Sequence, residues 1–163
     1  MRANADAVSP ESQGAWFERW VRRQARDPRW GCFLVAECDG LVEGYGMTVW
    51  WSPDLVEDPP ANVVPAGYYL MGTWVEPTVR RHGLGLALAQ ARLDWIRERA
   101  DEAWYWTRRD NEASQRLHQR LGFVPFTEDF WFPPRARTDS RLYRLSWPER
   151  AGLVLDPPDP ATV

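Results

Sequence analysis

The stretch Arg80-Arg81-His82-Gly83-Leu84-Gly85 joins an apolar segment, residues 66–75, to a long segment, residues 84–100. The apolar segment contains tyrosine and tryptophan and predicts a β-strand, whereas leucine, alanine and arginine recur at helical spacing in the second and predict an α-helix. A helix start leaves several backbone N–H groups unpaired near the positive end of its dipole, and glycine lets an anion approach them closely. Two arginines add charge and the fork geometry that suits phosphate oxygens. The stretch therefore predicts a pyrophosphate-binding turn.

Other phosphate-binding motifs do not fit this turn. The dinucleotide motif G-x-G-x-x-G fails because position 88 is leucine, and the Gly-Lys-Ser/Thr of a P-loop is absent. The alternative interpretation of the turn alone is an ordinary helix start beside surface arginines.

Outside the turn, apolar periodicity and turn residues predict the remaining elements. Asp39-Gly40 is a strong hairpin signal, and Gly44 and Gly46 in the strand that follows predict a bulge or a close approach. We expect helices over 11–26 and 111–121, a loop over 52–65, and strands over 32–38, 41–51, 102–107, 123–132 and 141–147. This order predicts a mixed sheet with helices on both of its faces.

Length and composition fit one domain. The chain has 163 residues, 44% of them hydrophobic, and a net charge of −3, which argues against a general nucleic-acid binder. No apolar stretch is long enough for a membrane span, and no secretory leader is evident, so we expect a cytoplasmic protein. No Cys/His cluster has zinc spacing, so no metal site is expected. Residues 1–147 are expected to form the domain, and residues 148–163 a proline-rich, loosely ordered tail.

Two signatures resemble those of the GNAT N-acetyltransferase superfamily. The first is Val75-x-Pro77-x-x-Arg80-x-x-Gly83-x-Gly85, and the second is Asn111-x-x-Ser114-x-x-Leu117-His118-x-x-Leu121-Gly122-Phe123. The resemblance covers about residues 14–147. It implies an α/β (α+β) fold: a mixed, mostly antiparallel, twisted sheet with helices on both faces and a central β-α-β acetyl-CoA-binding unit. Strands 66–75 and 102–107 would splay apart to admit the cofactor. Family members usually begin with a strand, which in residues 1–10 would be very short, missing or supplied by another chain.

The resemblance also implies how acetyl-CoA would be held. Backbone N–H groups of the turn would hold the pyrophosphate, the backbone of the preceding strand end would pair with the pantetheine arm and polarise the acetyl carbonyl, and two polar residues of the second signature would contact CoA further along. The implied cofactor-binding residues are Trp74, Val75, Arg80, Arg81, His82, Gly83, Leu84, Gly85, Asn111 and Ser114.

The catalytic groups are less clearly marked. Family members usually supply the acid that protonates the leaving thiolate from a tyrosine, where this chain has His118, and Tyr143 is a rival donor. Glu76 is a candidate base, with Glu128, Asp129 and an ordered-water relay as alternatives.

Aromatic side chains are candidates for the acceptor pocket. The expected pocket residues are Trp50, Trp51, Tyr69, Met71, Trp106 and Trp131. The predicted function is acetyl transfer from acetyl-CoA to a primary amine, most simply that of a small molecule. The alternatives are acetylation of a protein or peptide and a non-catalytic acyl-CoA sensor, and a homodimer is left open.

Overall fold

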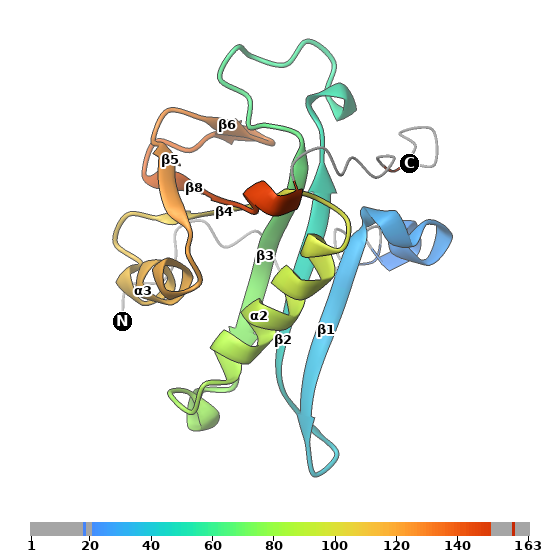
Figure 1. The fold of residues 1–163 in the computed structure, drawn as a ribbon, viewed down its shortest axis with the longest axis vertical. Helices are drawn as coiled ribbons and strands as arrows, with labels where there is room; N and C mark the ends of the chain where they lie inside the picture. Colours follow the sequence, from blue (N-terminus) through green and yellow to red (C-terminus); the bar gives the residue numbers. More distant parts are fainter. Residues whose placement is uncertain (1–17, 19–20, 151–157, 159–163) are drawn as a thin grey trace.

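A six-stranded sheet forms the centre of the protein in the computed structural model, which describes residue 18, residues 21–150 and residue 158 (Figure 1). The strand order is β1-β2-β3-β4-β8-β5. The strands are β1 (Gly31–Cys38), β2 (Leu41–Trp51), β3 (Gly67–Val75), β4 (Glu102–Arg108), β5 (Val124–Thr127) and β8 (Ser140–Ser146). Strands β3 and β4 run parallel, and the other neighbouring pairs run antiparallel. The expected mixed, mostly antiparallel sheet is confirmed.

Shorter elements connect and flank these strands. They are the 3₁₀ helices η1 (Pro28–Trp30), η2 (Pro53–Leu55), η3 (Pro77–Val79) and η4 (Pro148–Arg150), the α-helices α2 (Leu84–Arg97) and α3 (Glu112–Arg120), and the hairpin of β6 (Trp131–Phe132) and β7 (Arg135–Ala136). A further helix over residues 21–26 lies at the β1 edge, where Gln24 Nε2 donates to the Gly31 carbonyl at 3.1 Å.

A β-bulge interrupts the pairing of β2 with β3. The register shifts between Tyr45 and Met47, where one residue of β2, Gly46, lies opposite two residues of β3, Gly72 and Thr73. Gly72 has φ 48°, and a Cβ added to it would lie 2.5 Å from the Met47 Cε, so the bulge favours glycine at this position. The bulge that the glycines of β2 predict is therefore confirmed, and it breaks the regular ladder in the middle of β3.

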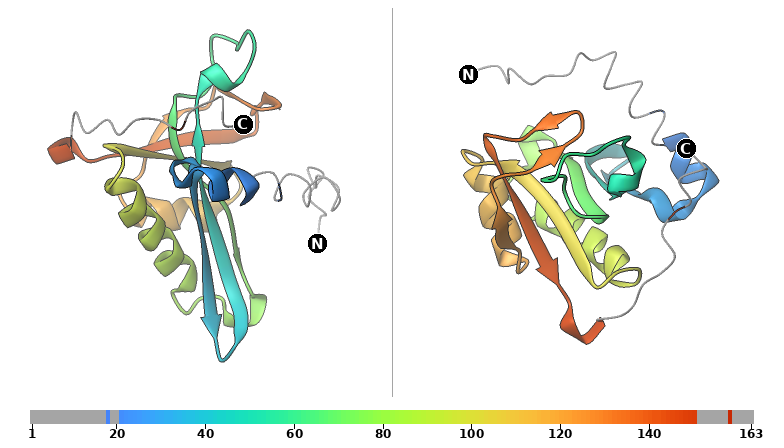
Figure 2. Two further views of the ribbon diagram at one scale, coloured as in Figure 1. Left: turned by 90° about the vertical axis from the view of Figure 1, so that its right-hand side faces the viewer. Right: turned by 90° about the horizontal axis from the view of Figure 1, so that it is seen from above.

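Helices α2 and α3 pack on the same face of the sheet, and Figure 2 shows α2 lying along that face. Alternate residues of β3 and β4 point towards the helices, as the period of two in a strand requires. The helix-side core consists of Tyr68, Leu70, Ala89, Leu93, Ile96, Ala103, Tyr105, Phe123 and Tyr143. Leu117 of α3 and Leu121, the residue that caps this helix, pack against it.

The opposite face of β3, β4 and β8 is covered by the β2–β3 loop and the β6–β7 hairpin, which lie side by side (Figures 1 and 2). Val63 of the loop forms an isolated bridge with Trp131 of the hairpin. The buried residues of this second core are Val64, Tyr69, Trp104, Phe130 and Leu142. The sheet thus has a helix-covered face and a loop-covered face.

One expected strand is wrong. Residues 123–132 do not form a continuous strand, because β5 ends at Thr127 and β6 begins at Trp131. The hydroxyl of Thr127 accepts a hydrogen bond from the Asp129 amide at 3.1 Å, which turns the chain. Phe130 then packs into the loop-side core with 2% of its surface exposed.

Parts of both ends lie outside the described residues. These include residues 1–10, where a first strand is in question, most of residues 11–20 of the expected first helix, and most of the tail after Arg150. Among the described residues, no helix is long and apolar enough to cross a membrane.

Candidate functional site

The turn before α2 has the geometry of an anion-binding site. Arg81 and Gly83 both adopt positive φ angles, 72° and 89°, which bend the backbone immediately before the helix. Gly83 is the N-cap and makes no side-chain cap bond, and its carbonyl accepts from the Ala87 amide at 2.9 Å. The amides that precede Ala87 in this first turn have no acceptor within the helix. Unpaired donors therefore gather at the positive end of the α2 dipole.

Gly85 lies on the side of α2 that faces α3 and β3. A Cβ added to it would lie 3.5 Å from Leu117 Cδ1 and 3.9 Å from Val75 Cγ2, an ordinary contact distance. The space between the turn, α3 and the end of β3 is therefore narrow at this point. A bulkier residue at Gly85 would fill it.

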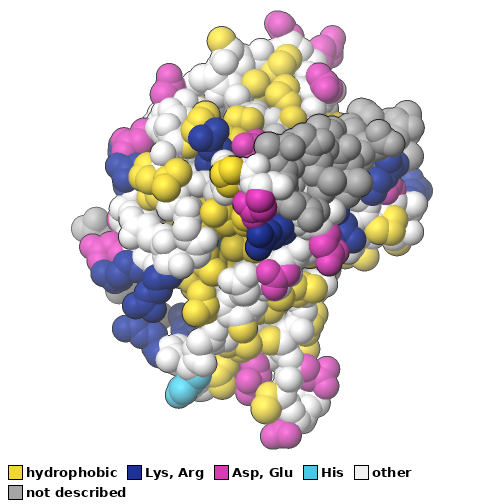
Figure 3. All heavy atoms as spheres, in the orientation of Figure 1, with side chains coloured by type: hydrophobic (Ala, Val, Ile, Leu, Met, Phe, Trp, Pro, Cys, Tyr) yellow, Lys and Arg dark blue, Asp and Glu magenta, His cyan; other side chains and the backbone are white. Residues whose placement is uncertain are grey.

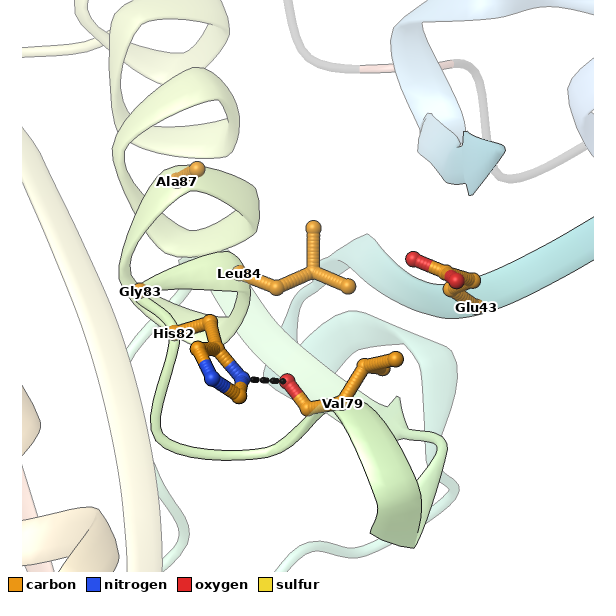
Figure 4. A pocket seen from close by; sticks show the side chains of 6 residues that line it. All are labelled: Glu43, Val79, His82, Gly83, Leu84 and Ala87. Atoms are coloured by element: carbon orange, nitrogen blue, oxygen red, sulfur yellow. Dashed lines mark hydrogen bonds between the residues drawn. The ribbon is translucent and has the colours of Figure 1, made fainter. Parts of the chain in front are cut away.

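A hollow of about 450 Å³ lies on the other side of the turn, next to β2 (Figure 4). Leu84 extends into it towards Glu43. The ring of His82 is held back against the chain, with its Nδ1 3.3 Å from the Val79 carbonyl oxygen. Leu84 thus lines the β2 side of the turn, whereas Gly85 faces β3 and α3.

Strand β3, which precedes the turn in the chain, has an unpaired edge. Its parallel pairing with β4 consists of one registered pair, Tyr69 with Trp104, after which the two strands diverge. The β4-facing edge of β3 from Leu70 to Val75 has no strand partner among the described residues. The predicted splaying of these two strands is confirmed. The backbone of Trp74 and Val75 lies at this edge, nearest the turn.

Basic side chains surround the entrance to this edge. Figure 3 shows arginines gathered around a hollow between α3 and the lower end of α2. Arg80 and Arg81 of the turn and Arg116 and Arg120 of α3 are exposed. Arg80 Nε also donates to the Val75 carbonyl at 2.9 Å and so ties the turn to the end of β3. The positive charges of these arginines would attract a ligand that carries phosphate groups.

The first turn of α3 carries the two polar residues of the second signature. Asn111 is the N-cap of α3, and its Oδ1 accepts from the Ser114 amide at 3.2 Å. The Ser114 hydroxyl is half-buried and lies 3.4 Å from His118 Nδ1. Contact of either residue with CoA stays a prediction.

The structure weighs against His118 as a proton donor. The residue is 8% exposed, and burial lowers its pKa to about 4. Its Nδ1 lies 2.9 Å from the Ser114 carbonyl oxygen, so Nδ1 carries the proton of the neutral ring and Nε2 is an acceptor. At neutral pH the ring has no proton to give from Nε2.

Tyr143 is a core residue rather than an exposed acid. It is 1% exposed and stacks on Tyr105, with ring centroids 4.7 Å apart. Tyr105 in turn stacks on His118 at 3.7 Å. The two acid candidates thus belong to one column of three rings beneath α3, which accounts for both residues by packing.

Glu76 and Glu128 are two of the candidate bases. Glu76 follows the end of β3, where its amide donates to the Glu43 carbonyl at 2.8 Å, about 13 Å along the strand from the bulge at Gly72. Glu128 is held by ion pairs with Arg109 and Arg141, which lower the pKa of its carboxyl group. Such a carboxylate is a weak base.

Asp129 is exposed and accepts from Asn62 Nδ2 at 2.7 Å. Glu102, which was not among the sequence-based candidates, accepts from Trp104 Nε1 at 3.0 Å. It is partly buried, and burial raises the pKa of its carboxyl group. The sequence did not indicate that Glu102 is partly buried, because the stretch EAWYWT predicts a strand that begins with a charged residue.

Four of the six expected pocket residues gather on the loop-covered face. Trp51, Tyr69, Met71 and Trp106 all pack against the second core there. We call this group, together with Phe132, the aromatic cluster. Phe132 contacts three of its members, with ring centroids 5.5 Å from Trp51, 5.5 Å from Tyr69 and 5.8 Å from Trp106.

Two expected pocket residues lie elsewhere, and one member of the cluster was missed. Trp50 points to the helix-covered face, where its ring lies 4.9 Å from Tyr68, because neighbouring residues of a strand face opposite ways. The same alternation in β6 places Phe132 in the cluster in preference to Trp131. Phe132 was assigned to a continuous strand, and the sequence did not show the turn that brings it over β3.

Comparisons with known proteins agree with this geometry. Residues 2–123 match the acetyltransferase (GNAT) family. A mycothiol acetyltransferase of Thermobispora bispora is 32% identical over 135 residues, which cover 81% of this chain and 43% of that protein. A mycothiol acetyltransferase of Salinispora arenicola is 31% identical over 130 residues, 76% of this chain and 39% of that protein. The chain thus spans less than half the length of these relatives.

Solved structures share the fold. A ribosomal-protein-alanine N-acetyltransferase from Brucella melitensis superposes with a TM-score of 0.60 at 23% identity, over 88% of this chain and 82% of that chain. A putative acetyltransferase from Salmonella typhimurium, solved with acetyl-CoA, gives 0.59 at 24% identity, over 88% and 77%. Among the described residues there is no group of three side chains that could hold a metal ion. From its two signatures, its splayed strands and these matches, the chain belongs to the GNAT acetyltransferase family, which uses acetyl-CoA.

Proposed function

We propose that this chain transfers the acetyl group of acetyl-CoA to a primary amine of a small molecule. The observation that carries the proposal is the unpaired edge of β3, which runs from the anion-binding turn to the level of the aromatic cluster. The turn suits a pyrophosphate, and an exposed strand edge suits an extended arm with amide groups. Acetyl-CoA contains both.

Each part of the donor has a matching group in the chain. The amides of Arg81 to Gly85 would bind the pyrophosphate, with Arg80 beside them. The backbone of Trp74 and Val75 would pair with the pantetheine arm as an added strand does. Asn111 and Ser114 at the start of α3 would contact CoA further along, across the narrow space beside Gly85.

The reaction needs little acid catalysis from the protein. The amine nitrogen forms a bond to the acetyl carbon, the carbon–sulfur bond breaks, and CoA leaves with the electron pair. A cysteine thiol has a pKa of about 8.5, and the CoA thiol is likewise a far stronger acid than an alcohol, so its thiolate is a good leaving group and can take a proton from water. A neutral His118 is compatible with this scheme. The ammonium proton of the acceptor would leave through water, and Glu102, the partly buried carboxylate beside Trp104, could accept it.

The acceptor would enter from the loop-covered face. There the β2–β3 loop and the β6–β7 hairpin cover the sheet and enclose aromatic rings, which favours a compact molecule over a peptide chain. The relatives named mycothiol acetyltransferases also favour a small acceptor. The chain covers less than half of their length, so the acceptor itself is not inferred from their name.

A panel of primary amines, assayed by release of free CoA thiol, tests this proposal. We expect turnover with compact amines and none with short peptides that carry free N-termini. Titration calorimetry with acetyl-CoA separates the two parts of the proposal. Absence of heat would overturn the donor site, whereas binding without turnover of any amine would indicate an acyl-CoA sensor, and turnover of peptides alone a protein acetyltransferase.

A further inference from the structure

Arg92 of α2 is fully buried, with 0% of its surface exposed, and makes no ion pair with a carboxylate among the described residues. A buried charge costs several kcal/mol unless hydrogen bonds replace its hydration. Burial lowers the pKa of Arg92 to about 10, which still leaves it protonated at neutral pH. Neither the resemblance to the family nor the packing of α2 accounts for a cation in this position.

The guanidinium is bonded to the β-bulge instead of to an acid. Nη1 donates to the Met47 carbonyl at 2.9 Å and to the Met71 carbonyl at 3.1 Å, and Nη2 donates to Thr73 Oγ1 at 2.8 Å. Nε donates to the Leu88 carbonyl one helical turn back, at 3.0 Å. Gly46 makes room for the group, because a Cβ there would lie 2.8 Å from Arg92 Cζ. Arg92 thus supplies donors at the point where the β2–β3 ladder is broken.

These bonds fix the orientation of one peptide unit. The Met71 carbonyl points to Nη1, which also binds Met47 of β2, so this carbonyl points towards β2 and α2. A trans peptide holds its C=O and N–H on opposite sides. The Gly72 N–H therefore points away from Arg92, towards the gap that opens between β3 and β4 after Tyr69.

We propose that Arg92 is a positioning residue, which clamps the Met71–Gly72 peptide so that the Gly72 N–H is aimed at the thioester carbonyl of acetyl-CoA. This inference rests on the proposed function and names the residue that orients its backbone donor. A carbonyl oxygen that gains negative charge during attack is stabilised by a donor held in place beforehand. The positive charge of Arg92, next to the same peptide, makes that N–H a stronger donor.

Substitution of Arg92 and of its exposed partner Thr73 tests the inference. Arg92→Met removes all the clamping donors, and Thr73→Val is the milder variant, which removes one acceptor of Arg92 at a solvent-exposed position. We expect kcat to fall about 100-fold in Arg92→Met and about fivefold in Thr73→Val, with the KM for acetyl-CoA within twofold of wild type. Thr73→Ser keeps the oxygen and should restore kcat.

The infrared C=O band of bound [1-¹³C]acetyl-CoA provides a readout that a purely structural role would not move. In the wild type the band should lie below its position in water, and in Arg92→Met and Thr73→Val it should return towards that position. Arg97→Gln on the exposed face of the same helix is the control and should leave the band and kcat unchanged. An unchanged band in both variants, or a loss confined to KM, would overturn the inference. A failure of wild type to bind acetyl-CoA would instead overturn the proposed function.

Discussion

The turn before α2 and the aromatic cluster are the two ends of one candidate site, and they are built in opposite ways. The turn consists of backbone groups contributed by six consecutive residues, Arg80 to Gly85, most of them exposed. The aromatic cluster consists of side chains from four elements that are distant in the sequence. A site of the first kind is encoded locally, whereas a site of the second kind depends on how distant segments pack.

The first test of this difference places a negative charge in the turn. Gly83→Asp should weaken acetyl-CoA binding about 100-fold or more, because a carboxylate would face the phosphates. Gly83 has φ 89°, so an aspartate at this position is strained, and a control variant with similar strain is needed. Titration calorimetry measures the change in Kd.

Gly40→Asp is the matched control for this substitution. Gly40 also has a positive φ, 77°, and neither glycine has an atom within 4 Å of an added Cβ. Backbone strain should therefore be similar in the two variants, while Gly40→Asp leaves the Kd unchanged. Equal Kd values for both variants would show that the turn does not bind the phosphates.

A second test uses His118, which stacks on Tyr105 in the helix-side core and contacts Ser114 in the first turn of α3. Its pKa is about 4 in the folded state and about 6.5 when unfolded, so between these values the unfolded chain binds more protons. Stability should therefore fall as pH is lowered from 7 to 4, by up to about 3 kcal/mol from this residue. His118→Phe keeps a ring on Tyr105 and should show a flatter pH dependence of the urea midpoint. The same slope in both proteins would contradict the assignment of a neutral, buried imidazole.

Local encoding explains what the sequence predicted well. Strand β3, helix α2 and the turn between them follow from contiguous patterns, and so does the bulge that Gly44 and Gly46 of β2 indicate. The splay of β3 from β4 followed from the resemblance to the family, not from any pattern within the two strands.

Long-range packing explains what the sequence did not reveal. Phe132 joins the aromatic cluster only because Thr127 caps a turn that breaks the expected strand. Arg92 lies four residues after Leu88 and four before Ile96, on the buried face of α2. A cation at such a spacing among apolar residues could have indicated a buried charge from the sequence alone. Trp50 and Trp51 show a further limit. They are neighbours of the same residue type on one strand, and residue type alone does not tell which of the two faces the site.

The third test addresses the aromatic cluster itself. Phe132→Leu removes ring contacts with Trp51, Tyr69 and Trp106 and should raise the KM for the accepted amine about tenfold. The Kd of acetyl-CoA should stay the same, because the turn is built from other elements. Phe126→Leu, at a 49% exposed position of β5, is the control for loss of an aromatic ring. A parallel change in the Kd of acetyl-CoA would show that the two ends of the site are not independent.

The smallest expected effect comes from Arg81, the turn residue that combines a charge with a left-handed backbone. Arg81 has φ 72°, a conformation that costs a residue with a Cβ about 1 kcal/mol and glycine almost nothing. Arg81→Gly should therefore raise the free energy of unfolding, by up to about 1 kcal/mol in urea titrations, less the added freedom of the unfolded chain. It should also weaken acetyl-CoA binding about threefold at low salt, because one exposed charge is lost.

Salt separates the two contributions of Arg81. The difference in Kd between wild type and Arg81→Gly should shrink as ionic strength rises to 0.5 M, since exposed charges are screened over about 10 Å already at 0.1 M. The gain in stability should persist, because it comes from the backbone. If the variant bound acetyl-CoA as tightly as the wild type at low salt, the backbone amides of the turn would hold the phosphates without help from this side chain, and the contrast between a backbone-built and a side-chain-built end of the site would be sharper still.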